Sequence, residues 1–333
     1  MTLKDVAYLA GVSTSTVSRV VSGKDIVAPA LKDKVENAIK KTGYTPNVNA
    51  RALANKNAGS IGLITPDLSL AFFGTLAAGV IEAADELGIM VDICNSKETK
   101  GHHLTAIKTL KNRGFRNIIL DDLHCDEEQI INLCKSIPGL VLINRFIPQI
   151  ANRCVCIENV LGGVISANYL LKNGHKNIAF LTSNSPIPDP LERIHGAKQA
   201  MIQQGISAEE CVIASGFPTI DGGKEAVSDL LAKSDKFTSI LAYNDNMATG
   251  AMNELQDRGY KVPEDISVVG FDNLAISIIC RPALTTMHYP IRDMAAYAVR
   301  LSLELTSKGG MKSNKTHRFV PTLIERKSVI NIN

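Results

Sequence analysis

The chain has 333 residues, of which 45% are hydrophobic and 21% are charged, and these proportions are typical of a soluble globular protein with two or three domains. It contains no run of about 18 apolar residues, which argues against a membrane-spanning helix. The N-terminus begins with a helix start, without a basic and then apolar leader, so we expect the protein to stay in the cytoplasm.

The charge is unevenly distributed along the chain. Residues 1–57 hold nine basic and four acidic side chains, a local charge of +5 in a chain whose net charge is +3, so the remainder carries −2. A compact basic segment beside a mildly acidic body favours a nucleic-acid partner for that segment. A solvated lysine-rich surface is the alternative.

Two short helices separated by a glycine are predicted at the N-terminus, and together they form a helix-turn-helix unit. The first begins at a cap formed by Thr2 and Asp5, and the second is capped by Ser13 and runs to Val21. Helical spacing places the valines of the second helix on one face and polar residues on the other. The valines are Val17, Val20 and Val21, and the polar residues are Thr14, Ser15, Ser18 and Arg19.

The polar face of the second helix suits the DNA major groove, where Ser and Thr contact base edges permissively and Arg binds guanine in a bidentate way. An ordinary capped surface helix is the alternative.

A third helix is predicted from Pro29 to Thr42, with proline at its first position. Its apolar stripe consists of Leu31, Val35, Ala38 and Ile39.

A short helix from Val48 to Ala54 is predicted after this unit, capped by Asn47. So short a helix is marginal in isolation, and we expect it to form only against a partner copy and DNA. Leu53 can then wedge between base pairs in the minor groove. Packing of Leu53 onto the neighbouring domain is the alternative.

These segments resemble the head of the lactose-repressor (LacI/GalR) family. The phrases that carry the resemblance are Leu3-Lys-Asp-Val-Ala, Ala10-Gly-Val-Ser, Thr16-Val-Ser-Arg-Val and Ala50-Arg-Ala-Leu-Ala. The resemblance implies that a dimer binds double-stranded palindromic operator DNA. It implies major-groove contacts by Thr14, Ser15 and Arg19, and minor-groove contacts by Ala50 and Leu53 of the hinge. Asn47, the cap of the hinge helix, is counted with these DNA-binding residues. One departure is Ala28 before Pro29, where the family usually has a Ser or Thr cap.

The rest of the chain alternates short apolar runs with helical stretches, which predicts an α/β fold with parallel sheets covered by helices on both faces. Ten strands are too many for one compact sheet here, so we expect two lobes of about five strands each. The predicted strands are residues 60–67, 89–95, 117–121, 140–144, 155–158, 177–182, 212–214, 239–243, 266–271 and 284–289.

The domains expected from this pattern are a DNA-binding head at residues 1–45, a hinge and linker at 46–57, and an effector-binding and dimerisation body at 58–333. The N-subdomain of the body covers about 58–158 and 290–320. The C-subdomain covers about 159–289 and 321–333.

Polar and aromatic residues gather where the predicted strands end. In open α/β sheets ligands bind beyond the carboxyl ends of the strands, so two facing lobes place a ligand in the cleft between them. Carboxylate, arginine, amides and aromatic faces suit a polyhydroxylated ligand. Taken singly, each residue also fits a strand-end cap or a loop hydrogen bond.

The body resembles the effector-binding core of the same family, which is similar to periplasmic sugar-binding proteins. The matching phrases are Asn244-Asp-x-Met-Ala-x-Gly-Ala, Ile266-Ser-Val-Val-Gly-Phe-Asp and Arg193-x-x-Gly. The resemblance implies that the ligand is held by Phe72, Phe73, Asn144, Arg193, Phe217, Asn244 and Asp272. Phrases such as His288-Tyr-Pro-Ile resemble the galactose-responsive members, which implies D-galactose as the inducer; another sugar or a purine is the alternative effector.

No cofactor or metal ion is predicted. The seven cysteines include no Cys-x-x-Cys pair, so core thiols are favoured over a zinc site. The pair His102-His103 stands before a helix without an evident nucleophile or metal-ligand set. The absence of Gly-x-Gly-x-x-Gly and phosphate-loop motifs disfavours an enzyme, and the basic head disfavours a solute-binding protein. The lack of a leucine heptad tail favours a homodimer over a tetramer.

Overall fold

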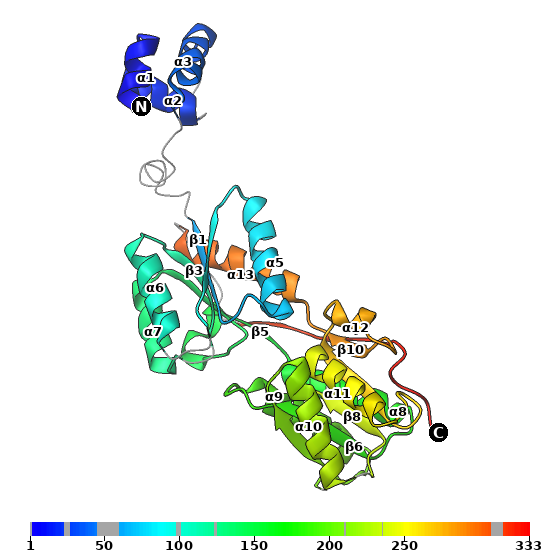
Figure 1. Ribbon diagram of the computed structural model, residues 1–333. Coiled ribbons are helices and arrows are strands. Elements are labelled where there is room, and N and C mark those ends of the chain that lie inside the picture. Colours follow the sequence, from blue (N-terminus) through cyan, green and yellow to red (C-terminus); the bar gives the residue numbers. More distant parts are fainter. Residues whose placement is uncertain are drawn as a thin grey trace. The chain divides into compact units, whose positions relative to one another are not determined.

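The computed structural model describes residues 2–22, 27–44, 60–97, 101–122, 125–209, 211–234, 236–307 and 316–333. The chain divides into two compact units, a head at Met1–Gly59 and a body at Ser60–Asn333 (Figure 1). Each unit is described by itself. The hinge residues Asn47, Ala50 and Leu53, with the helix predicted around them, lie outside the described residues.

The head is a helix-turn-helix with a third supporting helix, as predicted: α1 (Leu3–Ala10), α2 (Thr14–Ser22) and α3 (Pro29–Thr42). The backbone N–H of Thr2 donates to the Asp5 carboxylate at 2.6 Å, and that of Thr16 donates to Ser13 Oγ at 3.1 Å, so both predicted caps are present. Gly11 at φ 64° makes the left-handed turn between the helices, where a side chain is disfavoured. The buried core of the head consists of Val6, Ala7, Val17, Val35 and Ala38.

One residue of the predicted apolar stripe does not enter this core. Leu31 is 38% exposed, because it lies in the first turn of α3 and the buried residues of that helix begin one turn later at Val35. Val20 and Val21 pack against the core while remaining partly exposed. A core this small reaches only one side of each helix.

The body contains two six-stranded sheets, which confirms the predicted parallel α/β class. All neighbouring strands are parallel except β12, which runs antiparallel to β10. In sheet order, the first sheet is β11 (His317–Phe319), β5 (Cys154–Ile157), β4 (Gly139–Ile143), β3 (Asn117–Asp121), β1 (Ile61–Thr65), β2 (Val91–Asn95). The second is β12 (Thr322–Ile324), β10 (Thr285–His288), β9 (Ser267–Asp272), β8 (Ser239–Ala242), β6 (Ile178–Ser183), β7 (Ile213–Gly216).

Helices cover both faces of each sheet, and the buried residues fall into two clusters per sheet. On the first sheet, α5 (Ala71–Asp85) and α13 (Ile291–Thr306) pack on one face, and α6 (His102–Asn112) and α7 (Glu127–Ser136) on the other. On the second, α8 (Asn159–Lys172) and α9 (Asp189–Gln203) lie opposite α10 (Ile220–Lys233) and α11 (Asp245–Asp257). The short helices η1 (Pro148–Arg153) and α12 (Ile276–Ile279) lie in connections.

All ten predicted strands are present, and two more were missed. The missed strands, β11 and β12, have three residues each and complete the first and second sheets respectively. The chain therefore passes between the sheets three times: after β5, between β10 and α13, and between β11 and β12. Both strands are short and contain exposed residues, so neither shows the apolar run by which a strand is predicted.

Candidate functional site

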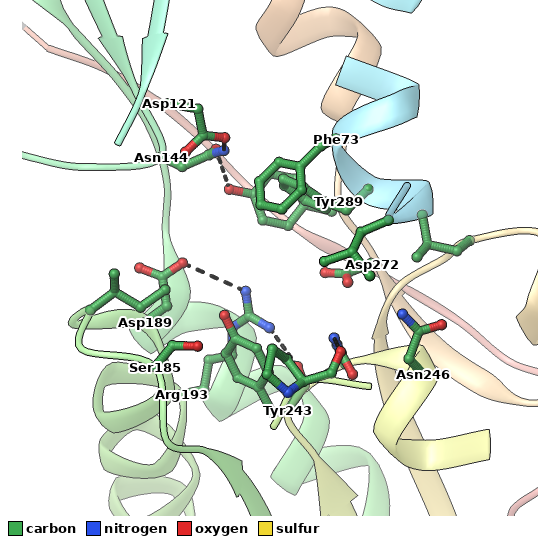
Figure 2. A pocket seen from close by; sticks show the side chains of 16 residues that line it. Phe73, Asp121, Asn144, Ser185, Asp189, Arg193, Tyr243, Asn246, Asp272 and Tyr289 are labelled. Carbon is green, nitrogen blue, oxygen red and sulfur yellow. Dashed lines mark hydrogen bonds and ion pairs between the residues drawn. The ribbon is translucent and has the colours of Figure 1, made fainter. Parts of the chain in front are cut away.

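A pocket lies between the carboxyl ends of the two sheets, with an empty volume of about 730 Å³ that includes the part open to solvent (Figure 2). Residues from both lobes line it. They are Leu70, Phe72, Phe73, Asp121, Asn144, Ser185, Ile187, Asp189, Arg193, Pro218, Tyr243, Asn244, Asn246, Asp272, Leu274 and Tyr289. This is the position at which open α/β sheets bind ligands.

The strand ends that face the pocket adopt an uncommon backbone conformation. Asn144, directly after β4, has φ 63°, and Asp272, the last residue of β9, has φ 107°. Non-glycine residues at positive φ cost free energy and gather at ligand sites, where the surrounding structure holds them in place. At both positions the unusual backbone accompanies a polar side chain that lines the pocket.

Three side chains form a hydrogen-bonded chain on the first-lobe side of the pocket. The Tyr289 hydroxyl donates to Asn144 Oδ1 at 2.8 Å, and Asn144 Nδ2 donates to Asp121 Oδ2 at 2.7 Å. Burial raises the pKa of Asp121 to about 8, although the hydrogen bond from Asn144 acts in the opposite direction. Since Tyr289 lies between β10 and α13, this chain links the pocket to a segment that crosses between the lobes.

Arg193, in α9, is the fixed cation of the pocket. Its Nε donates to Asn159 Oδ1 at 2.9 Å and its Nη1 donates to the carbonyl oxygen of Tyr243 at 2.6 Å. The guanidinium also lies over the rings of Phe271, at 3.6 Å, and Tyr243, at 4.7 Å. Hydrogen bonds and ring contacts together hold the guanidinium in one orientation, which suits the binding of a small polar ligand.

Two further buried carboxyl groups lie near Arg193. Burial raises the pKa of Asp189 to about 6 and that of Asp272 well above its usual value, while the positive charge of Arg193 lowers both. Asp189 Oδ2 stands 3.9 Å from Arg193 Nη2, which is too long for a hydrogen bond. The pocket thus offers carboxylate oxygens whose hydrogen-bonding capacity Arg193 does not saturate.

Asn244 caps a helix after its strand and also lines the pocket, the two roles that the sequence left open. Its Oδ1 accepts from the backbone N–H of Met247 at 2.9 Å, which caps α11, and its Nδ2 donates to the carbonyl oxygen of Pro218 at 3.1 Å. The same side chain lines the pocket. It therefore holds the β7–α10 loop against α11 as well as lining the pocket.

Comparisons with known proteins agree along the whole chain. The model for bacterial regulatory proteins of the lacI family matches residues 2–47, and that for a periplasmic binding protein-like domain matches residues 167–329. The HTH-type transcriptional regulator GalS of Salmonella typhimurium is 40% identical, over 99% of this chain and 96% of its own length. The chain belongs to the lacI family of bacterial regulatory proteins.

Two more comparisons support this assignment. The HTH-type transcriptional regulator GalR of Escherichia coli is 37% identical over 98% of this chain and 95% of its own length. Among solved structures, that of the lac repressor dimer bound to operator and the anti-inducer ONPF superposes with a TM-score of 0.90 at 27% identity, covering 99% of both chains. This lacI-family chain is accordingly a DNA-binding transcriptional regulator and not an enzyme. In the described part of the chain, no helix is long and apolar enough to cross a membrane.

The structure brings most of the predicted ligand residues of this regulator together. Phe72, Phe73, Asn144, Arg193, Asn244 and Asp272 all line the pocket. Phe217 does not line it, and its side chain is 64% exposed. The backbone of Phe217 lies so close to Gly222 that a Cβ there would stand 2.1 Å from the Phe217 carbonyl oxygen, and in this tight turn Pro218, not Phe217, faces the pocket.

Several pocket residues were not predicted. Asp121 ends a strand that was predicted correctly, so the strand-end rule could have found it. Tyr289 ends the strand predicted at residues 284–289, and the sequence left open whether it is a pocket or a hinge residue. Asp189 and Asn246 lie in the first turns of α9 and α11, where the sequence gives no sign that they face the other lobe.

On the head, α2 presents the residues predicted to contact DNA. Thr14, Ser15 and Arg19 are exposed, whereas Val17 on the opposite face is fully buried. The N-terminal end of α2 is free of acidic residues, which leaves its positive dipole end open to a phosphate or a base edge.

Proposed function

We propose that this chain is a transcriptional repressor that binds palindromic operator DNA as a homodimer and is released from it by a small sugar, D-galactose. The observation that carries the sugar part of the proposal is the pocket of buried carboxyl groups around the fixed guanidinium of Arg193. The galactose assignment rests on the resemblance to galactose-responsive family members and on the similarity to GalS and GalR.

The chemistry of the pocket fits a pyranose. Asp272, Asp121 and Asp189 can accept hydrogen bonds from ring hydroxyls, and the forked guanidinium of Arg193 can donate to neighbouring oxygens. The rings of Phe72 and Phe73 can cover the apolar face of the sugar. Asn144 and Asn244 hold fixed amide groups on the two sides of the pocket, one from each lobe.

In the head, we propose that Thr14, Ser15 and Arg19 contact base edges in the major groove. Asn47, Ala50 and Leu53 are proposed to contact the minor groove as a hinge helix within residues 46–57, a role that rests on the resemblance alone. The head would then be residues 1–45 and the body 58–333, with subdomains of about 58–158 with 290–320 and about 159–289 with 321–333. This function places the protein in the cytoplasm.

The proposed switch is a linkage between the two ligands. Sugar in the pocket contacts both lobes and favours their closure, and the three crossing segments transmit this change to the dimer and its hinges. Operator affinity then falls by the coupling free energy, and by reciprocity operator weakens sugar binding by the same factor.

The experiment that tests the proposal uses the full chain and an oligonucleotide enriched by selection from a random pool. Its affinity for the chain is measured without sugar and with saturating D-galactose, D-glucose or hypoxanthine. We expect D-galactose alone to weaken binding, by roughly 5–150-fold for a coupling of ordinary size. Unchanged affinity with D-galactose would reject it as the inducer, and a response to hypoxanthine would favour a purine effector instead.

A further inference from the structure

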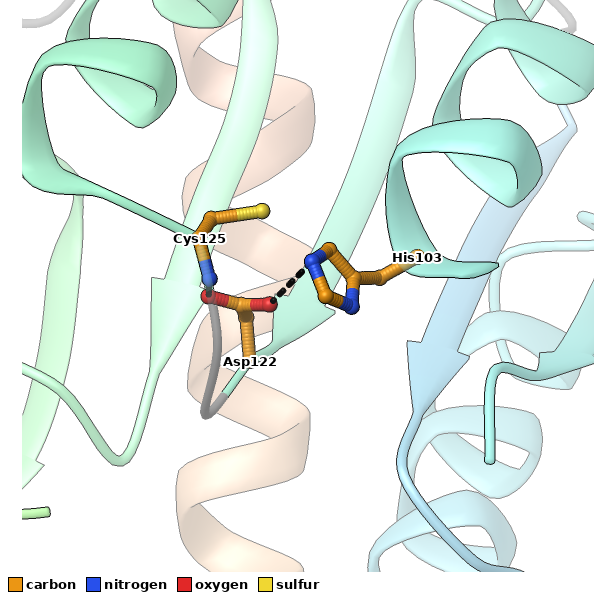
Figure 3. Close-up of side chains that lie close together, drawn as sticks. All are labelled: His103, Asp122 and Cys125. Atoms are coloured by element: carbon orange, nitrogen blue, oxygen red, sulfur yellow. Dashed lines mark hydrogen bonds and ion pairs between the residues drawn. The ribbon is translucent and has the colours of Figure 1, made fainter. Parts of the chain in front are cut away.

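A buried cluster in the first lobe is formed by His103 in α6, Asp122 after β3 and Cys125 before α7 (Figure 3). Each residue offers one ligand atom, and these atoms lie within 4.8 Å of one another. Imidazole nitrogen, carboxylate oxygen and cysteine sulfur are the three donor types of protein zinc sites. None of the three side chains lines the sugar pocket.

Asp122 is the residue whose hydrogen bonding points to a missing partner. Its Oδ2 accepts from the backbone N–H of Cys125 at 2.8 Å and from Arg145 Nη1 at 3.2 Å. Its Oδ1 is buried and accepts no hydrogen bond from the described residues, and His103 Nε2 stands 3.6 Å away from it. A buried acceptor without a donor destabilises the fold, and a bound cation can take the place of the donor.

We propose that His103, Asp122 and Cys125 bind a thiophilic divalent cation of the Zn²⁺ class. Zinc stands about 2.0–2.3 Å from such ligands, so tetrahedral coordination needs donor atoms about 3.3–3.8 Å apart, a contraction of roughly 1 Å from the observed spread. The thiol of Cys125 loses its proton to solvent as the metal–sulfur bond forms. A water molecule takes the fourth position, as in other three-ligand sites.

The surroundings of the cluster support this choice of cation. The carboxylate and the thiolate together balance the charge of a divalent ion, and sulfur with imidazole disfavours Mg²⁺ and Ca²⁺. Arg145 holds Asp122 Oδ2 and also donates to the carbonyl oxygen of Cys125 at 2.7 Å. It thereby orients the free Oδ1 toward the cluster, as outer partners of metal ligands commonly do.

Cobalt titration of the full, reduced chain without a histidine tag tests the proposal. We expect one equivalent of Co²⁺ to give a thiolate-to-cobalt charge-transfer band that stoichiometric Zn²⁺ removes. Cys125→Ser is expected to abolish the band, and His103→Gln to weaken Co²⁺ binding by roughly a hundredfold or more. Cys134→Ser is the matched control, since Cys134 is also a buried cysteine of this lobe, and it is expected to keep the band.

X-ray absorption of the unaltered chain with one equivalent of Zn²⁺ shows whether sulfur binds the metal ion, even if a variant fails to fold. We expect one sulfur neighbour at about 2.3 Å beside nitrogen and oxygen neighbours at about 2.0–2.2 Å. A coordination sphere without sulfur, no charge-transfer band in the unaltered chain, or a band unchanged in Cys125→Ser would overturn the proposal. The cluster would then be an ion-pair network of His103, Asp122 and Arg145 only.

Discussion

Two arginine–carboxylate groups, one in each lobe, use their arginines differently. In the first lobe, Arg145 donates directly to the Asp122 carboxylate at 3.2 Å. In the pocket, Arg193 donates to the neutral oxygens of Asn159 and Tyr243 and stands 3.9 Å from Asp189. The first arrangement neutralises a carboxylate within the fold, whereas the second leaves carboxylate oxygens available to a ligand.

The sequence neighbours of Asp122 and Arg145 belong to the pocket. Asp121 and Asp122 are consecutive at the end of β3, and Asn144 and Arg145 are consecutive just after β4. Asp121 and Asn144 line the pocket and bond to each other, whereas Asp122 and Arg145 pair outside the pocket lining. Adjacent residues thus enter different environments.

The largest expected effect is a difference between substitutions of Arg193 and Arg145. Arg193→Ala is expected to reduce galactose affinity by roughly a hundredfold or more, because it removes the fixed donor and leaves Asp189 and Asp272 buried without their cation. Arg145→Ala is expected to lower the free energy of unfolding by about 3 kcal/mol while changing sugar affinity by less than roughly tenfold. Calorimetry with galactose and urea unfolding measure the two quantities.

The control for both variants is Arg258→Ala, which removes an exposed pair with Glu254 on α11. Surface pairs of this kind contribute little to stability. Neither galactose affinity nor the free energy of unfolding should therefore change appreciably in this variant. Equal loss of sugar binding in the Arg145 and Arg193 variants would contradict the division of roles.

A second effect concerns the pH dependence of stability. The pKa of Asp121 is raised from 3.8 to about 8 by burial, so between these values the folded state keeps a proton that the unfolded state has lost. Stability from this group is therefore highest at low pH and falls as pH rises toward 8. Asp121→Asn is expected to flatten the decline between pH 5 and pH 8 without abolishing it, since burial raises the pKa values of Asp189 and Asp245 in the same direction.

Unfolding midpoints in urea at pH 5, 6, 7 and 8 measure this slope for the parent and the variant. Asp92→Asn serves as a control because the Asp92 side chain is partly exposed and lies outside the pocket, paired with Arg113. An unaltered slope in Asp121→Asn would show that the Asp121 carboxyl is ionised in the fold.

A smaller effect is expected from Tyr289→Phe. The change removes the hydrogen bond to Asn144 Oδ1 and leaves that partly buried acceptor without its donor, which costs about 1 kcal/mol of stability. Urea unfolding measures the cost, with Tyr260→Phe in the other lobe as the matched variant. A cost as small as that of Tyr260→Phe would mean that the hydroxyl adds nothing to the crossing segment.

The smallest effect is expected from Phe217→Ala. Its side chain is 64% exposed and lies outside the pocket lining, so both stability and galactose affinity should stay within about 0.5 kcal/mol of the parent. Phe73→Ala, which removes a ring that lines the pocket, should lower galactose affinity by more. A large loss in the Phe217 variant, measured by the same calorimetry, would show that this ring reaches the sugar in the bound state.

The sequence by itself determined the elements of this protein and the edge of the sheets at which the pocket lies. Helical and strand periodicity located the three head helices and ten of the twelve described strands. Six of the seven predicted ligand residues line the pocket, and Asn144, Asn244 and Asp272 reach it because parallel strands bring their carboxyl ends to one edge.

Only the tertiary structure decided which side chains meet. The hydrogen bonds of Asn144 to Asp121 and to Tyr289 join segments that are 23 and 145 residues apart in the chain. His103 and Cys125 likewise meet only because α6 and α7 cover the same face of the first sheet. Spacing along the chain records local periodicity, whereas contacts of this kind depend on the order and register of strands, which no single segment encodes.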